Sequence, residues 1–138
     1  MHPPFFPPIT GKSRMKYLFA VSLFALAACG SAQQFDAIPP DVNRRNVPND
    51  TVSVTAESFR FTPEVIRVKT GTLVTLRINS IGGTHGFKLS AFGIDERLDE
   101  NVPKSIELYV SRKGEYDFRC SHFCGLGHLG MTGRIIVE

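Results

Sequence analysis

The chain has 138 residues, 42% of them hydrophobic, and a formal net charge of +3 at neutral pH. This length suits one folded domain with appended segments, and the composition is ordinary for a globular protein. Lys12, Arg14 and Lys16 lie in a predicted signal peptide, and subtracting these three from 16 Lys and Arg leaves 13, which equals the 13 Asp and Glu. A near-neutral chain without an evident basic patch argues against a nucleic-acid partner.

Residues 1–28 are predicted to form a signal peptide. Arg14 and Lys16 precede an apolar run over residues 17–28. A charged region followed by a short hydrophobic region is typical of an export signal. The run is too short for a transmembrane helix, which needs roughly 20 residues. We therefore expect an exported protein on the periplasmic or cell-surface side of a membrane.

Two further expectations concern this N-terminal segment. Residues 1–14 contain four prolines and do not resemble a charged export region, so we expect translation to begin at Met15. The apolar run ends in Leu-Ala-Ala-Cys-Gly, which resembles a bacterial lipobox with Cys29 as the lipidated residue. The alternative is a secretory peptide cut at an Ala-x-Ala-like site, with Cys29 incidental. We predict lipidation of Cys29, and hence a membrane anchor.

Residues 29–50 are predicted to be the lipidated Cys and a flexible linker. After Gly30 this segment has few large apolar residues, several Asn and Gln, and three Pro. Such a composition buries too little surface to fold independently. A flexible chain of this length spans roughly 25 Å on average, which would hold a domain near the membrane.

Residues 51–138 are predicted to fold as one all-β domain. Short stretches alternate between apolar and polar residues and are separated by Gly or Pro signals, which is the pattern of half-buried strands. No stretch has helical periodicity over three turns. The predicted strands cover residues 52–56, 65–68, 73–79, 87–89, 105–110, 116–120 and 133–137. About seven short strands indicate a β-sandwich.

An acidic cluster lies between two of these predicted strands, at Asp95, Glu96, Asp99 and Glu100. We expect a solvated loop here. The alternative is a docking patch for a basic partner such as a cytochrome.

Most of the metal-binding side chains of the predicted domain lie in one short loop. The sequence from residue 120 to residue 131 reads Cys-Ser-His-Phe-Cys-Gly-Leu-Gly-His-Leu-Gly-Met, and its donors are Cys120, His122, Cys124, His128 and Met131. Its glycines allow the loop to fold tightly and bring these donors together. His85 follows two glycines at a strand end, and we expect it to tie a second sheet to the site. Sulfur and imidazole donors together favour copper over hard cations.

Several other interpretations of this loop remain open. A disulfide between Cys120 and Cys124 would suit an exported protein, but it does not require the His and Met residues. A zinc site would leave Met131 without a role, and Cys-x3-Cys is not the usual zinc spacing. A mononuclear blue-copper site with His85, Cys124, His128 and Met131 would leave Cys120 unused. A Cys-His hydrolase lacks an evident third orienting residue.

The motif Gly-x-Tyr-x-Phe-x-Cys at residues 114–120, continued as Cys-x3-Cys-Gly-x2-His-x2-Met, resembles the cupredoxin domain of cytochrome c oxidase subunit II. That domain carries the dinuclear CuA centre, which also occurs in nitrous oxide reductase. The His-Gly-Phe at residues 85–87 is similar to the segment that supplies the family's first imidazole. The resemblance covers about residues 51–138 and implies a cupredoxin-like Greek-key β-sandwich.

The resemblance also implies the ligands of two copper ions. The thiolates of Cys120 and Cys124 would bridge the two ions. His85 and His128 would each bind one ion terminally, and Met131 would be the weak axial ligand of one of them. The implied axial donor of the other ion is the backbone carbonyl of the residue midway between the thiols.

That residue is His122, which is unusual at this position and adds an imidazole that would be able to bind or deliver metal. The chain also has no Trp, whereas oxidase subunits generally use one near the site for electron entry. These departures concern the oxidase-subunit role more than the copper site.

The function implied by the resemblance is single-electron transfer in a respiratory chain. The expected donor is cytochrome c or another cupredoxin, and the expected acceptor is a terminal oxidase or reductase. We expect no self-contained catalysis, so any oxidase activity would belong to a complex. The alternative is a periplasmic module that binds or delivers copper for the assembly of such centres.

Overall fold

The computed structural model describes residues 37–138. The predicted signal peptide, the predicted start at Met15 and the predicted lipidation at Cys29 lie outside the described residues. The chain divides into two units, Met1–Gly30 and Ser31–Glu138, and only the second contains described residues.

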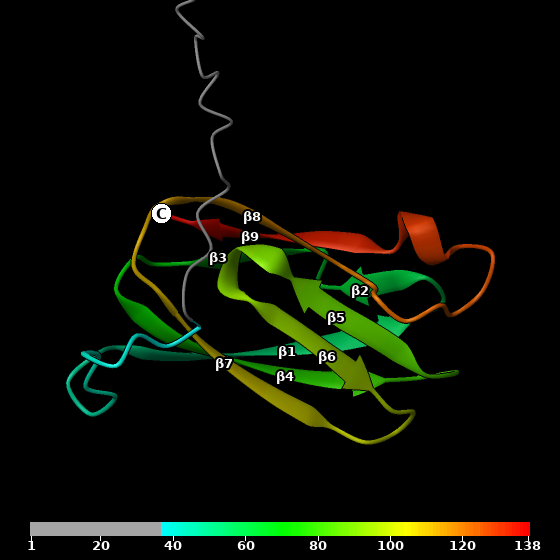
Figure 1. The fold of residues 1–138 in the computed structure, drawn as a ribbon, viewed down its shortest axis with the longest axis horizontal. Coiled ribbons are helices and arrows are strands. Elements are labelled where there is room, and N and C mark those ends of the chain that lie inside the picture. Colours follow the sequence, from blue (N-terminus) through cyan, green and yellow to red (C-terminus); the bar gives the residue numbers. More distant parts are fainter. Residues whose placement is uncertain (1–36) are drawn as a thin grey trace, which may run out of the picture. The chain divides into compact units, whose positions relative to one another are not determined.

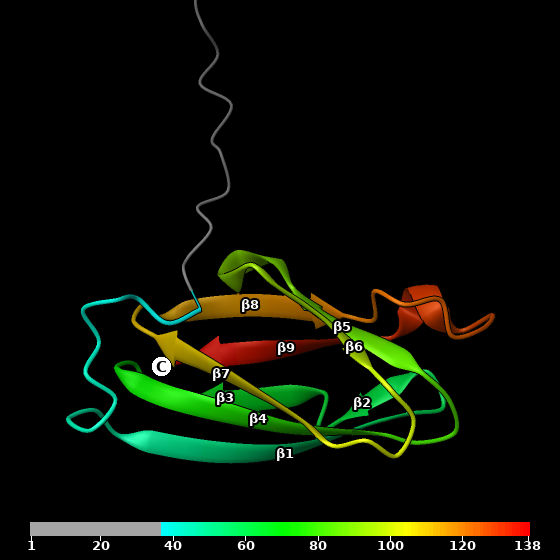
Figure 2. The same cartoon turned by 60° about the horizontal axis from the view of Figure 1, so that its bottom comes forward.

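Two β-sheets pack face to face and enclose the core (Figure 1; Figure 2). One sheet has the strand order β2-β1-β4-β7 and the other the order β3-β9-β8-β5-β6. The strands are β1 (Asn49–Glu57), β2 (Arg60–Thr62), β3 (Val65–Val68), β4 (Thr72–Ser80), β5 (His85–Leu89), β6 (Ile94–Leu98), β7 (Lys104–Val110), β8 (Gly114–Arg119) and β9 (Thr132–Val137). The helices of the described chain are two 3-10 turns, η1 (Ser90–Phe92) and η2 (His128–Gly130).

This architecture confirms the predicted all-β sandwich and corrects its detail. The described residues form nine strands instead of about seven. All seven predicted segments are strands, because their alternating apolar residues face the core. In β1, for example, Val54 and Ala56 are buried while their neighbours are at least partly exposed. The prediction missed β2, which has only three residues, and β6.

The prediction of a solvated acidic loop was wrong for the part that forms β6. Ile94 and Leu98 are buried and anchor the two ends of this edge strand. The carboxylates along it point outward and are neutralised by nearby cations: Asp95 by Lys88 at 2.7 Å, Glu96 by Lys104 at 2.6 Å and Asp99 by Arg97 at 2.7 Å. Charged side chains are common on edge strands, where they discourage pairing with other chains. The alternative, a docking patch for a basic partner, stays a prediction.

Three aromatic rings connect the core to one end of the sandwich. These residues, which are at most 1% exposed, are Phe61 on β2, Phe87 on β5 and Phe118 on β8. Their ring centroids are 4.9 to 5.9 Å apart. Burying each ring stabilises the fold by about 1.5–3 kcal/mol. Phe87 lies two residues after His85, and Phe118 two residues before Cys120. Since side chains two apart share a face of a strand, the core continues directly into the predicted site.

The described part of the predicted linker contacts the domain at several points. The Tyr109 N–H donates to the Ala37 carbonyl at 2.6 Å, and the Leu73 N–H donates to the Pro48 carbonyl at 2.8 Å. Arg44 forms an ion pair with Glu107 at 2.6 Å. The linker's role as a membrane spacer stays a prediction. Residues 37–138 include no helix with the length and apolar character needed to cross a membrane.

Candidate metal centre

The predicted ligand loop joins β8 to β9 at one end of the sandwich (Figure 1). The Cys120 N–H donates to the Met131 carbonyl at 2.9 Å and closes the loop at its base. His85 begins β5, which pairs with β8 through Lys88 and Arg119. The expectation that His85 ties a second sheet to the site was therefore wrong, because both strands belong to the same sheet. Ligands from neighbouring strands are held in a fixed register by the sheet.

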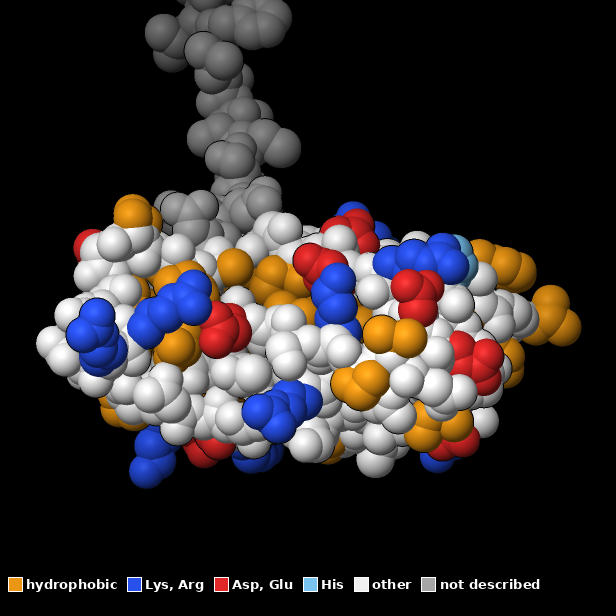
Figure 3. All heavy atoms as spheres, turned by 90° about the horizontal axis from the view of Figure 1, so that it is seen from below, with side chains coloured by type: hydrophobic (Ala, Val, Ile, Leu, Met, Phe, Trp, Pro, Cys, Tyr) orange, Lys and Arg blue, Asp and Glu red, His pale blue; other side chains and the backbone are white. Residues whose placement is uncertain are grey.

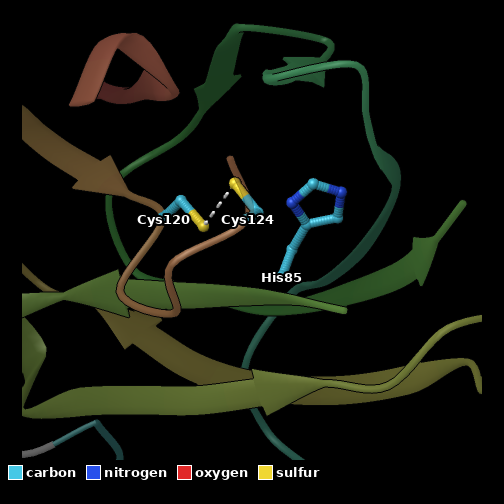
Figure 4. A group of neighbouring side chains, drawn as sticks. All are labelled: His85, Cys120 and Cys124. Atoms are coloured by element: carbon cyan, nitrogen blue, oxygen red, sulfur yellow. Dashed lines mark hydrogen bonds between the residues drawn. The ribbon is translucent and has the colours of Figure 1, made fainter. Parts of the chain in front are cut away.

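The two thiols face each other without a bond between them. Their sulfur atoms are 3.7 Å apart, whereas a disulfide has a length of about 2.05 Å. Both cysteines are free. The imidazole of His85 points toward them, and ligand atoms of the three residues lie within 4.8 Å of one another (Figure 4). This geometry favours a metal site over the disulfide alternative.

The other predicted donors surround the same two sulfurs. The His128 Nδ1 is 3.7 Å from the Cys124 sulfur, and the Met131 sulfur is 3.9 Å from it. The Cys120 thiol donates to the backbone carbonyl of His122 at 3.0 Å. The structure thus brings together all six groups that the sequence singled out. It does so with Cys124 near the centre of the group.

His85 is buried and keeps one imidazole nitrogen unpaired. Its side chain is 3% exposed, and its Nδ1 has no hydrogen-bond partner. Burial lowers the pKa of His85; a backbone interaction with Ile81 opposes this effect, and the charges of His122 and His128 add to it. The imidazole is therefore neutral near pH 7 and keeps a free lone pair. Buried polar atoms without a partner are uncommon, and a bound cation would satisfy this one.

The thiol of Cys124 is held in its protonated form. Burial, and after it the hydrogen bond and charge of Cys120, raise the pKa of Cys124 to about 11. A coordinating metal cation reverses this preference, because it binds the thiolate and displaces the proton. On the other sulfur, the Gly86 N–H donates to Cys120 at 3.4 Å. That amide is placed to stabilise a Cys120 thiolate.

Gly86 also allows the loop to approach β5 closely. A Cβ at this position would lie 2.4 Å from the Ser121 hydroxyl oxygen and 2.6 Å from the His122 backbone nitrogen. Real Cβ atoms essentially never come so close to other atoms, so any other residue would push the loop away. The close approach of the loop therefore explains why the middle residue of the His-Gly-Phe segment is glycine.

Two features of this site were not predicted from the sequence. The ring of Phe59, in the turn between β1 and β2, lies against the backbone of Gly125 and Gly127. Loop side chains also project into solvent, where Phe123, Leu126 and Leu129 are 73%, 103% and 91% exposed. Apolar side chains protrude at this end of the molecule in Figure 3. The apolar residues between the ligands were visible in the sequence. The Phe59 contact was not predictable, because no local sequence pattern indicates it.

The donor set as a whole fits copper. The donors around the Cys124 sulfur are the second thiol, two imidazole nitrogens and a fully buried thioether. Soft thiolate and thioether ligands with imidazole are typical of copper proteins. Zinc has little affinity for a thioether, so a zinc site would leave the Met131 sulfur, which is 0% exposed, unexplained.

Comparison with known proteins agrees with this geometry. Residues 18–137 match the family described as "Cupredoxin-like domain". Over 92 residues the chain is 34% identical to cytochrome c oxidase subunit 2 of Thermus thermophilus. The aligned region covers 66% of this chain and 68% of that protein. It is 29% identical over 98 residues to nitrous-oxide reductase of Cupriavidus necator, covering 68% of this chain but only 15% of the reductase.

A solved structure shows the same fold. The periplasmic domain of subunit II of cytochrome oxidase from Bradyrhizobium japonicum superposes with a TM-score of 0.59 at 17% identity, covering 64% of this chain and 83% of that domain. Together with the convergent ligand set, these similarities identify the chain as a member of the cupredoxin-like family, a copper-binding domain related to cytochrome c oxidase subunit II and nitrous oxide reductase.

Proposed function

We propose that this protein is a single-electron carrier with a dinuclear copper centre of the CuA type. One observation carries the proposal: two free thiols lie 3.7 Å apart, with imidazole donors beside them. Two facing thiolates are suited to bridging two metal ions. A single copper ion of the blue type would need only one of them.

In this proposal the thiolates of Cys120 and Cys124 would hold both ions. His85 and His128 would each hold one ion through the imidazole. The Met131 thioether would be a weak additional donor to one ion, and the backbone carbonyl of His122 would be an additional donor to the other. The free Nδ1 of His85 supports its role, and so does the short distance from the Cys124 sulfur to the Nδ1 of His128.

When bound, a thiolate-bridged copper pair spreads one unpaired electron over both ions, so that a change of oxidation state moves the bonds little. The chain contributes a site that needs little rearrangement. The Cys120–Met131 backbone hydrogen bond closes the loop, and the Gly86 amide holds the Cys120 sulfur. The three packed Phe rings fix the strands beneath the site. Ligands held by a packed second layer keep their geometry.

The proposed partners and location follow from this function. The donor would be cytochrome c or another cupredoxin, and the acceptor a terminal oxidase or reductase. We propose that the protein is exported and held at a membrane by lipid on Cys29. The periplasmic location of the Bradyrhizobium japonicum domain supports an exported site.

A second candidate function is copper delivery to other proteins. One observation favours it: His122 is only partly buried beside the two thiols, and its imidazole has no role in the proposed centre. A partly exposed imidazole beside the thiols would offer a path for copper exchange. Rapid copper release that depends on the His122 imidazole would support this function over electron transfer.

The deciding experiment uses the unit Ser31–Glu138 loaded with copper under a mild oxidant. We expect two copper ions per chain, an electron paramagnetic resonance spectrum with hyperfine splitting from both nuclei, and reversible one-electron reduction. One copper ion with single-nucleus splitting would contradict the dinuclear proposal and favour a blue-type or delivery site. A Cys120→Ser variant is the matched control, because it removes one bridging sulfur and retains the other donors.

A further inference from the structure

The turn between β1 and β2 has an unusual sequence for its conformation. Glu57 pairs with Arg60, so Ser58 and Phe59 form a two-residue turn. Their φ angles are 46° and 62°, and such positive values at both positions are required by a type I′ turn. Asn-Gly is the preferred sequence there, because bulky residues are disfavoured at positive φ. A large aromatic residue in this place opposes the local preference of the turn.

The ring of Phe59 lies on the ligand loop and not in the core. It is 41% exposed and does not belong to the cluster of buried core residues. Its atoms lie so close to two glycines that a Cβ on Gly127 would be 2.4 Å from the ring's Cγ, and a Cβ on Gly125 would be 2.9 Å from its Cε1. The residue therefore contributes little to the core but covers the backbone between Cys124 and His128.

The backbone angles show that the ring is what excludes a side chain at Gly127. Gly127 has φ −86° and ψ 0°, values that any residue adopts easily. Gly125, in contrast, has φ 130° and favours glycine for its own conformation. At position 127 the need for glycine comes from Phe59, which lies 68 residues earlier in the chain.

This contact acts on the segment that connects two proposed ligands. The His128 N–H donates to the Gly125 carbonyl at 3.1 Å, so the position of His128 follows that of the glycine backbone. The outer side of this segment is solvent, since Leu126 and Leu129 are exposed. Strained residues persist where the surroundings hold them, and they concentrate at functional sites.

We propose that Phe59 is a positioning residue of the metal centre: its ring clamps the Gly125–Gly127 backbone and thereby fixes His128 relative to Cys124. The inference deepens the proposed function and rests on this loop being the metal site. It does not depend on whether one or two copper ions bind.

The first test is Phe59→Gly in the full chain. Glycine relaxes the turn, so the metal-free variant should melt at the same temperature as the wild type or higher. We expect the amide of His128 to exchange with solvent faster in the metal-free variant, because the clamp is gone. Copper release to a chelator should become about tenfold faster, as is typical when a residue supporting the ligands is lost. Phe59→Tyr should restore wild-type exchange and release.

The second test is coupling between Phe59 and Gly127. In the wild-type background, Gly127→Ala should accelerate copper release about tenfold, and in the Phe59→Gly background it should add almost nothing. Gly130→Ala is the matched control in the same loop, because a Cβ there meets nothing within 4 Å. It should behave as the wild type in both backgrounds.

The inference is overturned if Phe59→Gly leaves amide exchange and copper release unchanged, or if the effects of the Phe59 and Gly127 variants simply add. A lowered melting temperature with unchanged exchange at His128 would also overturn it, since that result assigns Phe59 a merely structural role. The exchange measurement uses metal-free protein, so its outcome is separate from the copper count that decides the proposed function.

Discussion

The Cys120 N–H donates to the Met131 carbonyl at 2.9 Å, which joins the first and last donors of the ligand loop through their backbones. The loop leaves β8 and enters β9 at this hydrogen bond, and the two strands are paired from Arg119 and Thr132 onward. The sheet therefore holds both ends of the loop in place. Most of the ligand geometry is a property of the folded chain.

Replacing either thiol should prevent formation of the proposed dinuclear centre. Cys124→Ser removes a soft donor that lies within 4 Å of the His128 and Met131 donors. We expect at most one weakly held copper ion and loss of the visible absorption of the copper–thiolate bonds. The melting temperature of the metal-free protein should change little, because Cys124 lies outside the fully buried core. Copper-to-protein ratios and absorption spectra measure this, with Val102→Ala, a change at a 58% exposed side chain, as control.

Copper binding should release protons at neutral pH. The pKa of Cys124 is raised to about 11, so below that pH its thiol is protonated and must lose its proton to bind metal. His85 contributes no proton near pH 7, because its pKa is lowered. Apparent affinity should therefore rise about tenfold per pH unit for each proton displaced. Titration calorimetry in buffers of different ionisation enthalpy measures the number, and copper binding without proton release would contradict the protonated thiol.

The metal-free protein should lose stability as the pH falls below the ordinary pKa of histidine. Burial lowers the pKa of His85 in the folded state, so the unfolded chain takes up a proton near pH 6.5 that the folded chain resists. Stability from this residue is complete above pH 6.5 and declines until the pH reaches the folded-state pKa. Melting curves at pH 7.5 and 5.5 measure the loss. A His85→Gln variant should show a smaller loss, and an equal loss in both proteins would rule out His85 as its source.

Adding a methyl group at Gly86 should displace the ligand loop. In Gly86→Ala the new Cβ would lie 2.4 Å from the Ser121 hydroxyl oxygen and 2.6 Å from the His122 nitrogen. Forcing atoms into such a contact destabilises a protein by about 1–3 kcal/mol. We also expect a lower copper affinity, because the Gly86 amide would move away from the Cys120 sulfur. Urea unfolding measures the loss of stability, and copper competition measures the loss of affinity. Gly82→Ala is unsuitable as a control, because Gly82 has φ 73° and an alanine there would strain the backbone for a different reason.

The exposed apolar side chains of the loop should matter for electron exchange and not for folding. Leu126 and Leu129 are 103% and 91% exposed, so Leu126→Ser and Leu129→Ser should leave the melting temperature unchanged. If a redox partner docks here, the two changes together should slow electron exchange with a c-type cytochrome about tenfold, as is common for buried anchors of an interface. Stopped-flow mixing measures the rate. Val65→Ser, at a 46% exposed side chain elsewhere, is the control.

The main strands and the ligand residues could be predicted from the sequence, because the patterns that identify them are local. Alternation with a period of two identified the main strands, since it reflects which side chains face the core. The donors of the loop are close in sequence, and their chemistry favoured copper over hard cations. His85 was also identifiable, because it follows two glycines in the connection between β4 and β5.

The tertiary structure decided what depends on contacts between distant segments. The sequence did not show that β5 and β8 belong to one sheet, and the pairing of Lys88 with Arg119 settles it. The strand β6 was not predicted, because only Ile94 and Leu98 face the core and the carboxylates between them gave it the composition of a loop. In the sequence Phe59 has no evident role, and only the fold places its ring against Gly127. Residue type and spacing determine which donors exist, whereas long-range packing determines where they are held.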